Sequence, residues 1–135
     1  MLINLAEELE YCEKLMYAAK SQTTPAHYHK KKKEDIICRN GKLTIQFWVE
    51  GPDATNTTDS LDVKVNGEFK SIKSGNKITL NSGERVTIVQ GVWHEFYPES
   101  DQCVIGEVST ANDDLNDNFF ANKNVGRFSD VDEDI

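Results

Sequence analysis

The most informative stretch of this 135-residue chain is His27-Tyr28-His29-Lys30-Lys31-Lys32-Lys33-Glu34, in which a glutamate follows two closely spaced histidines. Side chains alternate between the two faces of a β-strand, so His27 and His29 should point the same way. A short turn or bulge after them could return the Glu34 carboxylate to the same point. His94, the only other histidine, can complete a set of three imidazoles and one carboxylate. The pattern predicts a metal site formed by His27, His29, Glu34 and His94.

Each histidine taken alone could equally be an incidental surface or core residue, but their joint spacing favours a metal site. Three nitrogens and one oxygen are ligands of intermediate softness, so Mn, Fe, Zn, Co and Ni all remain possible. Four protein ligands around an octahedral ion leave two positions open. Two neighbouring oxygens of a small molecule could occupy them.

The length and composition predict a single domain, residues 1–135, with one core. No segment approaches the roughly 20 apolar residues that cross a bilayer, and the first residues lack the basic region of a signal peptide. We therefore expect a cytoplasmic protein that does not bind membranes. The net charge of −8 argues against a nucleic-acid partner. The three cysteines, Cys12, Cys38 and Cys103, are too widely spaced for a cysteine metal site and fit a reducing compartment.

Hydrophobic periodicity divides the chain into three parts. Residues 1–10 place Leu2, Leu5, Ala6 and Leu9 at helical spacing, which predicts a short N-terminal helix. Residues 11–128 contain short β-branched and aromatic runs broken by turn signals, such as Asn66-Gly67, which is typical of a β-hairpin. This pattern predicts an all-β sandwich or barrel. Residues 129–135 are acidic and almost without apolar anchors, so we expect a frayed tail.

The run of four lysines between His29 and Glu34 has two interpretations. It could be a solvated turn, or it could form the rim of the metal site and attract a polar or anionic ligand. The sequence leaves both open.

Two blocks of the chain resemble the paired motifs of the cupin superfamily. The first is the stretch quoted above, continued to Gly41, and the second runs from Gly83 through Gly91 and His94 to Pro98. The chain departs from the usual motifs at Ser21 and Val89, positions that shape turns and bind no metal. The resemblance implies a small antiparallel jelly-roll barrel with the metal held by the four ligands named above. It also implies pairing into a homodimer.

Segments outside the two blocks resemble the D-lyxose isomerase family, manganese-dependent cupins that interconvert aldoses and ketoses. They are Glu13 to Ala18, Lys33 to Gly41, Gly106-Glu107-Val108-Ser109, Asn112 to Asn118 and Gly126-Arg127-Phe128. The resemblance covers about residues 11 to 134 and implies Mn²⁺ as the cofactor and a sugar as the substrate. The implied reaction is D-lyxose to D-xylulose, with D-mannose to D-fructose as a second reaction. It would proceed by proton transfer between C1 and C2 of a metal-chelated open-chain sugar, although a hydride shift could use the same residues.

The same resemblance implies Glu107 as the catalytic base, with Lys14 and Asp117 as polar partners that position or protonate the substrate. The residues themselves leave alternatives open. Glu107 shares one strand face with Ile105, so it either faces the metal or is a surface carboxylate. Lys14 is an exposed strand residue or an inward proton donor. Asp117 lies in a polar loop, where such side chains often cap turns.

Two other functions use the same metal ligands. An iron-dependent cupin dioxygenase is one, and a non-catalytic cupin that binds a metal and a sugar is the other. Dioxygenase sites commonly offer a more apolar pocket, whereas this chain supplies Glu107, Asp117 and several lysines. The sequence therefore favours the isomerase.

Overall fold

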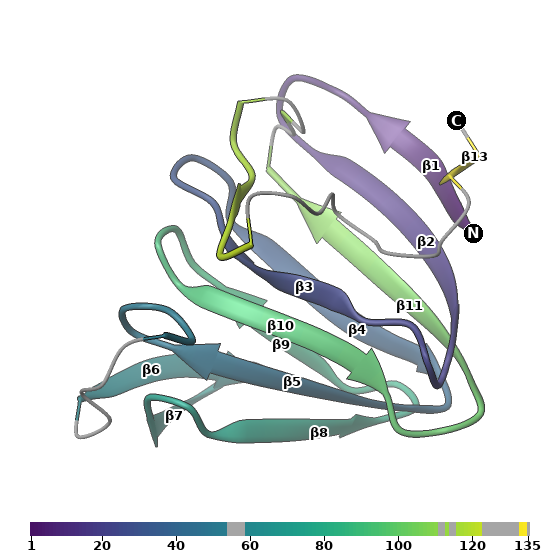
Figure 1. The fold of residues 1–135 in the computed structure, drawn as a ribbon. Helices are drawn as coiled ribbons and strands as arrows, with labels where there is room; N and C mark the ends of the chain where they lie inside the picture. The colour runs from purple at the N-terminus through teal and green to yellow at the C-terminus, as the bar shows by residue number, and fades with distance from the viewer. Residues whose placement is uncertain (54–58, 111–112, 114–115, 123–132, 135) are drawn as a thin grey trace.

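The structure is a computed structural model that describes residues 1–53, 59–110, 113, 116–122 and 133–134. The regular secondary structure in these described residues consists of β-strands alone (Figure 1). They are β1 (Leu2–Glu7), β2 (Cys12–Ala19), β3 (Thr24–Tyr28), β4 (Glu34–Asn40), β5 (Lys42–Trp48), β6 (Ser60–Val65), β7 (Glu68–Lys73), β8 (Lys77–Asn81), β9 (Arg85–Ile88), β10 (Trp93–Pro98), β11 (Gln102–Ser109), β12 (Phe119–Phe120) and β13 (Glu133–Asp134).

The strands form two sheets that face one another (Figure 1). The larger sheet has the order β13-β1-β2-β11-β4-β9-β6-β7, and the smaller has the order β12-β3-β10-β5-β8. All neighbouring strands are antiparallel except the pair β1 and β13, which is parallel. The predicted all-β, cupin-type antiparallel architecture is confirmed.

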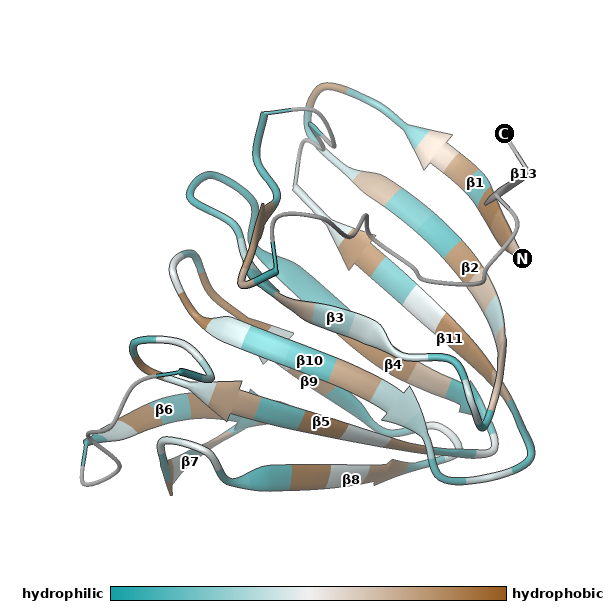
Figure 2. Ribbon diagram, in the orientation of Figure 1, coloured by the Kyte–Doolittle hydropathy of each residue, from teal (hydrophilic) through white to brown (hydrophobic). Residues whose placement is uncertain are grey.

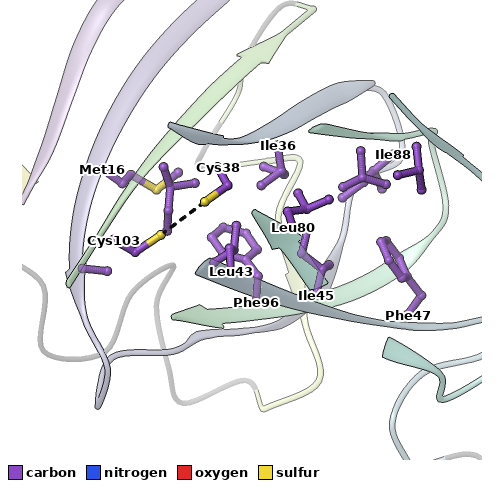
Figure 3. Packing of buried hydrophobic residues seen from close by; sticks show 14 of the residues in the cluster. Met16, Ile36, Cys38, Leu43, Ile45, Phe47, Leu80, Ile88, Phe96 and Cys103 are labelled. Carbon is purple, nitrogen blue, oxygen red and sulfur yellow. Dashed lines mark hydrogen bonds between the residues drawn. The ribbon is translucent and has the colours of Figure 1, made fainter. Parts of the chain in front are cut away.

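The hydrophobic core fills the space between the two sheets. Figure 3 shows side chains such as Ile36 and Ile88, from the larger sheet, approaching Ile45 and Phe96 from the smaller sheet. Along β5, apolar segments alternate with polar ones (Figure 2), as expected for a strand with one face in the core.

The Asn66-Gly67 pair forms the predicted hairpin turn between β6 and β7. Both residues have positive φ, 50° at Asn66 and 84° at Gly67. Such angles are required at both central residues of the turn type that matches the twist of paired strands.

The predicted N-terminal helix is wrong, because residues 2 to 7 form strand β1. Leu2 is buried, whereas Ile3 and Leu5 are exposed, so burial alternates as in a strand. Pairing with β2 through Leu2↔Met16 and Ile3↔Leu15 outweighs the weak helical spacing of the leucines. A bulge between Asn4 and Ala6 blurs the period-2 pattern that would have indicated a strand.

The described residues contain no helix long and apolar enough to cross a membrane. The predicted frayed tail, residues 129–135, falls mostly outside the described residues. Only the backbone of Glu133–Asp134 is described there, and it pairs with Leu2 and Ile3 of β1.

Candidate metal centre and active site

The two sheets each contribute candidate metal ligands. In the smaller sheet, His27 on β3 lies opposite His94 on the neighbouring β10, and His29 follows one residue after β3 ends. Glu34 is the first residue of β4, in the larger sheet. All four side chains are buried, and one ligand atom from each lies within 4.8 Å of the others. The structure therefore brings together the four ligands that the sequence predicts.

Each imidazole is held by a hydrogen bond from its Nδ1 atom to a backbone carbonyl. His27 bonds to Pro25 at 2.7 Å, His29 to Asp117 at 2.8 Å and His94 to Val92 at 2.9 Å. A carbonyl oxygen only accepts, so each Nδ1 atom must carry the proton. In a neutral ring this leaves the lone pair on Nε2, which is the tautomer that binds a metal ion.

The arrangement fits a cation better than a hydrogen-bonded cluster. The Nε2 atoms of His29 and His94 lie 3.3 and 2.9 Å from Oε1 of Glu34, yet none of these buried atoms has a hydrogen-bond partner. Three atoms with lone pairs that face one another repel unless a cation lies between them. Buried polar atoms without partners are uncommon and costly, and a bound metal ion would account for all three.

The protonation states suit metal binding as well. Burial, together with the neighbouring His94 and His29, lowers the pKa of His27 well below its ordinary value, so the ring is neutral. Burial would raise the pKa of Glu34, but the Lys32 ammonium and His29 outweigh it, and the pKa falls well below the ordinary value. A neutral imidazole and an ionised carboxylate are the forms that bind metals.

A second cluster of charged groups lies beside the metal ligands, on the larger sheet. Glu107 on β11 pairs in register with Lys14 on β2, and both side chains are buried. The Lys14 Nζ atom lies 3.9 Å from Oε2 of Glu107. Of the two alternatives weighed for each residue, the structure favours the inward one: Glu107 is no surface carboxylate, and Lys14 is no exposed strand residue.

Lys32 connects the two clusters and was missed in the sequence analysis. Its side chain is only 1% exposed, whereas Lys30, Lys31 and Lys33 are exposed. The Nζ atom lies 3.4 Å from Oε2 of Glu34 and 3.4 Å from Oε2 of Glu107. Lys32 precedes Glu34 by two positions, the spacing that puts two side chains on one face of an extended chain. That signal was available, but its three identical neighbours concealed it.

Asp117 is buried, and its carboxylate faces the backbone of the lysine run. Oδ1 accepts hydrogen bonds from the amides of Lys30 and Lys31 at 2.8 and 3.0 Å. Oδ2 accepts from the amides of Lys32 and Lys31 at 3.0 and 3.3 Å. The residue thus lies at the site as expected, but its carboxylate contacts backbone amides.

Aromatic side chains surround a cavity of about 430 Å³ next to this centre. It is lined by Tyr28, Trp93, Asn118, Phe119 and Phe120. Tyr28 and Trp93 directly neighbour ligand histidines in sequence, so they lie on the opposite face of their strands. Phe120 also packs against the His27 ring, with centroids 5.3 Å apart, and so lies between the cavity and the metal ligands.

Comparisons with known proteins agree with this description. A solved cupin-2 domain protein of Shewanella frigidimarina has a TM-score of 0.53 at 23% identity, over 80% of this chain and 78% of that one. The fold is therefore of the cupin type, and the histidine–glutamate cluster within it is a candidate metal site.

The family follows from two sequence matches. The family model for D-lyxose isomerase matches residues 3–135. The D-lyxose/D-mannose isomerase of Escherichia coli O157:H7 is 33% identical over 127 residues, which are 92% of this chain and 56% of that relative. This chain therefore belongs to the D-lyxose isomerase family, although it spans little more than half the length of that relative.

A second solved structure extends the likeness in fold. The L-ribose isomerase of Cellulomonas parahominis, solved with L-psicose, has a TM-score of 0.70 at 18% identity. The match covers 93% of this chain and 71% of that one.

Proposed function

We propose that the protein is a metal-dependent isomerase that interconverts an aldose and a ketose. The observation that carries the proposal is the buried Glu107 carboxylate, which lies between the ammonium groups of Lys14 and Lys32 and is linked through Lys32 to the metal ligand Glu34. A buried carboxylate of this kind needs compensating charge, and the two lysines supply it. Family membership and the name of the Escherichia coli relative support the same reaction class.

The chain supplies the groups that such a reaction needs. His27, His29, Glu34 and His94 would hold a divalent ion, which supplies a Lewis acid that makes the C–H bond beside a sugar carbonyl more acidic. Glu107 is the proposed base that moves the proton between C1 and C2. Lys32 and Lys14 would donate hydrogen bonds to sugar oxygens as negative charge develops on them. Burial of all three side chains keeps bulk water away from the proton in transfer.

The proposed substrate is D-lyxose, converted to D-xylulose, with D-mannose to D-fructose as a second reaction. The name of the Escherichia coli relative, D-lyxose/D-mannose isomerase, supports both sugars. We propose Mn²⁺ as the ion, which an imidazole and carboxylate ligand set accepts along with other divalent transition metals.

The substrate and the metal are tested together with a panel of aldoses. The protein is stripped of metal, reconstituted separately with Mn²⁺, Fe²⁺, Zn²⁺, Co²⁺ and Ni²⁺, and assayed for ketose formation. We expect D-xylulose from D-lyxose with Mn²⁺ and no ketose without metal. A protein that binds Mn²⁺ but converts no aldose would indicate the non-catalytic alternative. Oxygen uptake with Fe²⁺ would indicate the dioxygenase.

We also propose that the protein forms a homodimer, as its resemblance to cupins implies. Sedimentation equilibrium measures this directly. A dimer mass supports the proposal, and a monomer mass at micromolar concentration contradicts it.

A further inference from the structure

We infer that Asp117 is a positioning residue, which holds the turn after His29 in the conformation that directs Lys32 into the active site. This inference deepens the proposed function and rests on it only for the kinetic part of its test. The family resemblance implies that the Asp117 side chain positions or protonates the substrate. The hydrogen bonds point to the backbone instead.

The carboxylate of Asp117 binds three consecutive amides. Its two oxygens accept four hydrogen bonds of 2.8 to 3.3 Å from the backbone N–H groups of Lys30, Lys31 and Lys32. Successive amides that converge on one point form a natural anion site, and hydrogen bonds to an ionised acceptor are the stronger kind. An asparagine at this position would offer one acceptor oxygen in place of two, and its NH₂ group would face an amide that also donates.

This contact determines where the lysine side chains go. Three consecutive residues share one acceptor group, so the chain must curl around the carboxylate. With the amides fixed, Lys30 and Lys31 stay exposed, the Lys30 ammonium lying 4.5 Å from the centroid of the Phe119 ring, and Lys32 points inward, between Glu34 and Glu107. Fixing a lysine side chain in a buried site costs conformational entropy, and this cost is smaller when the backbone already directs the side chain there. Asp117, which is 85 residues away from Lys32 in the sequence, supplies that constraint.

The loop that carries Asp117 is anchored independently of its carboxylate. Its amide donates to the Asp113 carbonyl at 2.9 Å, and β12, two residues further on, pairs with β3. The main-chain oxygen of Asp117 accepts the Nδ1–H group of His29. A substitution that changes only the side chain therefore leaves this bond to a metal ligand in place. Loss of the carboxylate should affect Lys32 and spare metal binding.

Asp117→Asn is the most selective variant, because it keeps the size of the side chain and replaces one acceptor oxygen with an NH₂ group. Asp113→Asn is a matched control in the same loop, since the Asp113 carboxylate accepts hydrogen bonds from Asn116 and, within the described part of the chain, contacts none of the three lysine amides. Hydrogen exchange of the Lys30, Lys31 and Lys32 amides, measured by NMR, gives a readout that needs no enzymatic activity. We expect exchange to be at least about tenfold faster in Asp117→Asn and unchanged in Asp113→Asn.

A double-mutant cycle with Lys32→Met tests the link to catalysis. We expect Asp117→Asn to lower kcat about tenfold or more in the wild-type background, with bound Mn²⁺ unchanged. In the Lys32→Met background the same change should have less than about a twofold effect, because the residue it positions is gone. Effects that multiply would overturn the inference and would indicate that Asp117 acts on the substrate directly.

Amide exchange in the wild-type protein tests the same inference and does not require any variant to fold. The three amides should be protected from exchange although two of their side chains are exposed. Exchange at the rate of an open turn would overturn the inference. If the wild type converts no sugar, the proposed function fails, while the exchange measurements still decide the role of Asp117.

Discussion

At the scale of single residues, the proton on each imidazole determines what the cluster can do. Backbone carbonyls of Pro25, Asp117 and Val92 fix the proton on Nδ1 in all three rings, so the Nε2 lone pairs converge. The strand alternation of His27 and His29 was predictable from sequence. Pro25 and Val92 are local partners, because each precedes its histidine by two residues. The Asp117 carbonyl was not predictable, because it comes from a loop 88 residues away from His29 in the sequence.

Lys32 provides a prediction at the same scale. Replacing it by methionine keeps the length of the side chain and removes the ammonium group that lies between Glu34 and Glu107. We expect kcat for the isomerisation to fall about 10²-fold, the loss typical of a group that assists proton transfer. The exposed neighbour gives the control: Lys31→Met should keep full activity. Equal activities of the two variants, measured at saturating sugar and Mn²⁺, would contradict a role for Lys32.

At the scale of elements, pairing decides what local pattern leaves ambiguous. Strands such as β5, β8, β9 and β10 carry clear β-branched or aromatic runs, and Asn66-Gly67 marks its turn plainly, so these were predictable. The first ten residues carry apolar residues that fit a helix equally well, and only register with β2 resolves the choice. No sequence pattern reports which neighbour a strand will find.

Whether residues 2–7 form strand β1 or a helix can be tested by measuring stability. Leu2 is 1% exposed and Leu5 is 52% exposed, although helical spacing would place both on one face. Leu2→Ala should cost about 2 kcal/mol or more of the free energy of unfolding, because it opens a cavity in the core. Leu5→Ala should change it by no more than about 0.5 kcal/mol. Chemical denaturation of both variants measures the difference, and equal losses would contradict the strand.

The hairpin between β6 and β7 offers a test of backbone strain alone. A Cβ atom added at Gly67 would meet no atom within 4 Å, so only its φ of 84° opposes a substitution. Gly67→Ala should therefore lower the free energy of unfolding by about 1 kcal/mol. Ser71→Ala, on the exposed strand β7, is the control and should change little. A neutral Gly67→Ala variant would show that the turn tolerates side chains.

At the scale of the whole molecule, the proposed active site draws its side chains from both sheets. The smaller sheet supplies three imidazoles and the larger supplies Glu34, Glu107 and Lys14. The metal ligands follow a spacing that a sequence can reveal. The side chains of Lys14, Lys32 and Glu107 meet because β11 lies between β2 and β4 in the larger sheet. The sequence does not reveal that strand order.

Packing of the core predicts how fast the three cysteines react with thiol reagents. All are buried, and Cys38 and Cys103 lie with their sulfur atoms 3.9 Å apart in the core (Figure 3). Burial, and then the neighbouring Cys38, raises the pKa of Cys103 to about 12, so its reactive thiolate is scarce at neutral pH. We expect thiol reagents to modify the native protein slowly and all three cysteines rapidly after unfolding. Rapid modification of Cys38 or Cys103 in the native state would contradict this packing.

The central claim is that Glu107 transfers a proton on a sugar held at the metal centre. Its most direct test is the rate at which Mn²⁺-loaded wild type and Glu107→Gln convert D-lyxose to D-xylulose, with Glu95→Gln on the outer face of β10 as the control. We predict that kcat falls by about 10²- to 10⁴-fold in Glu107→Gln, while its metal content and the activity of the control stay unchanged. A Glu107→Gln variant as active as the wild type, or a wild type that forms no ketose, would contradict the claim.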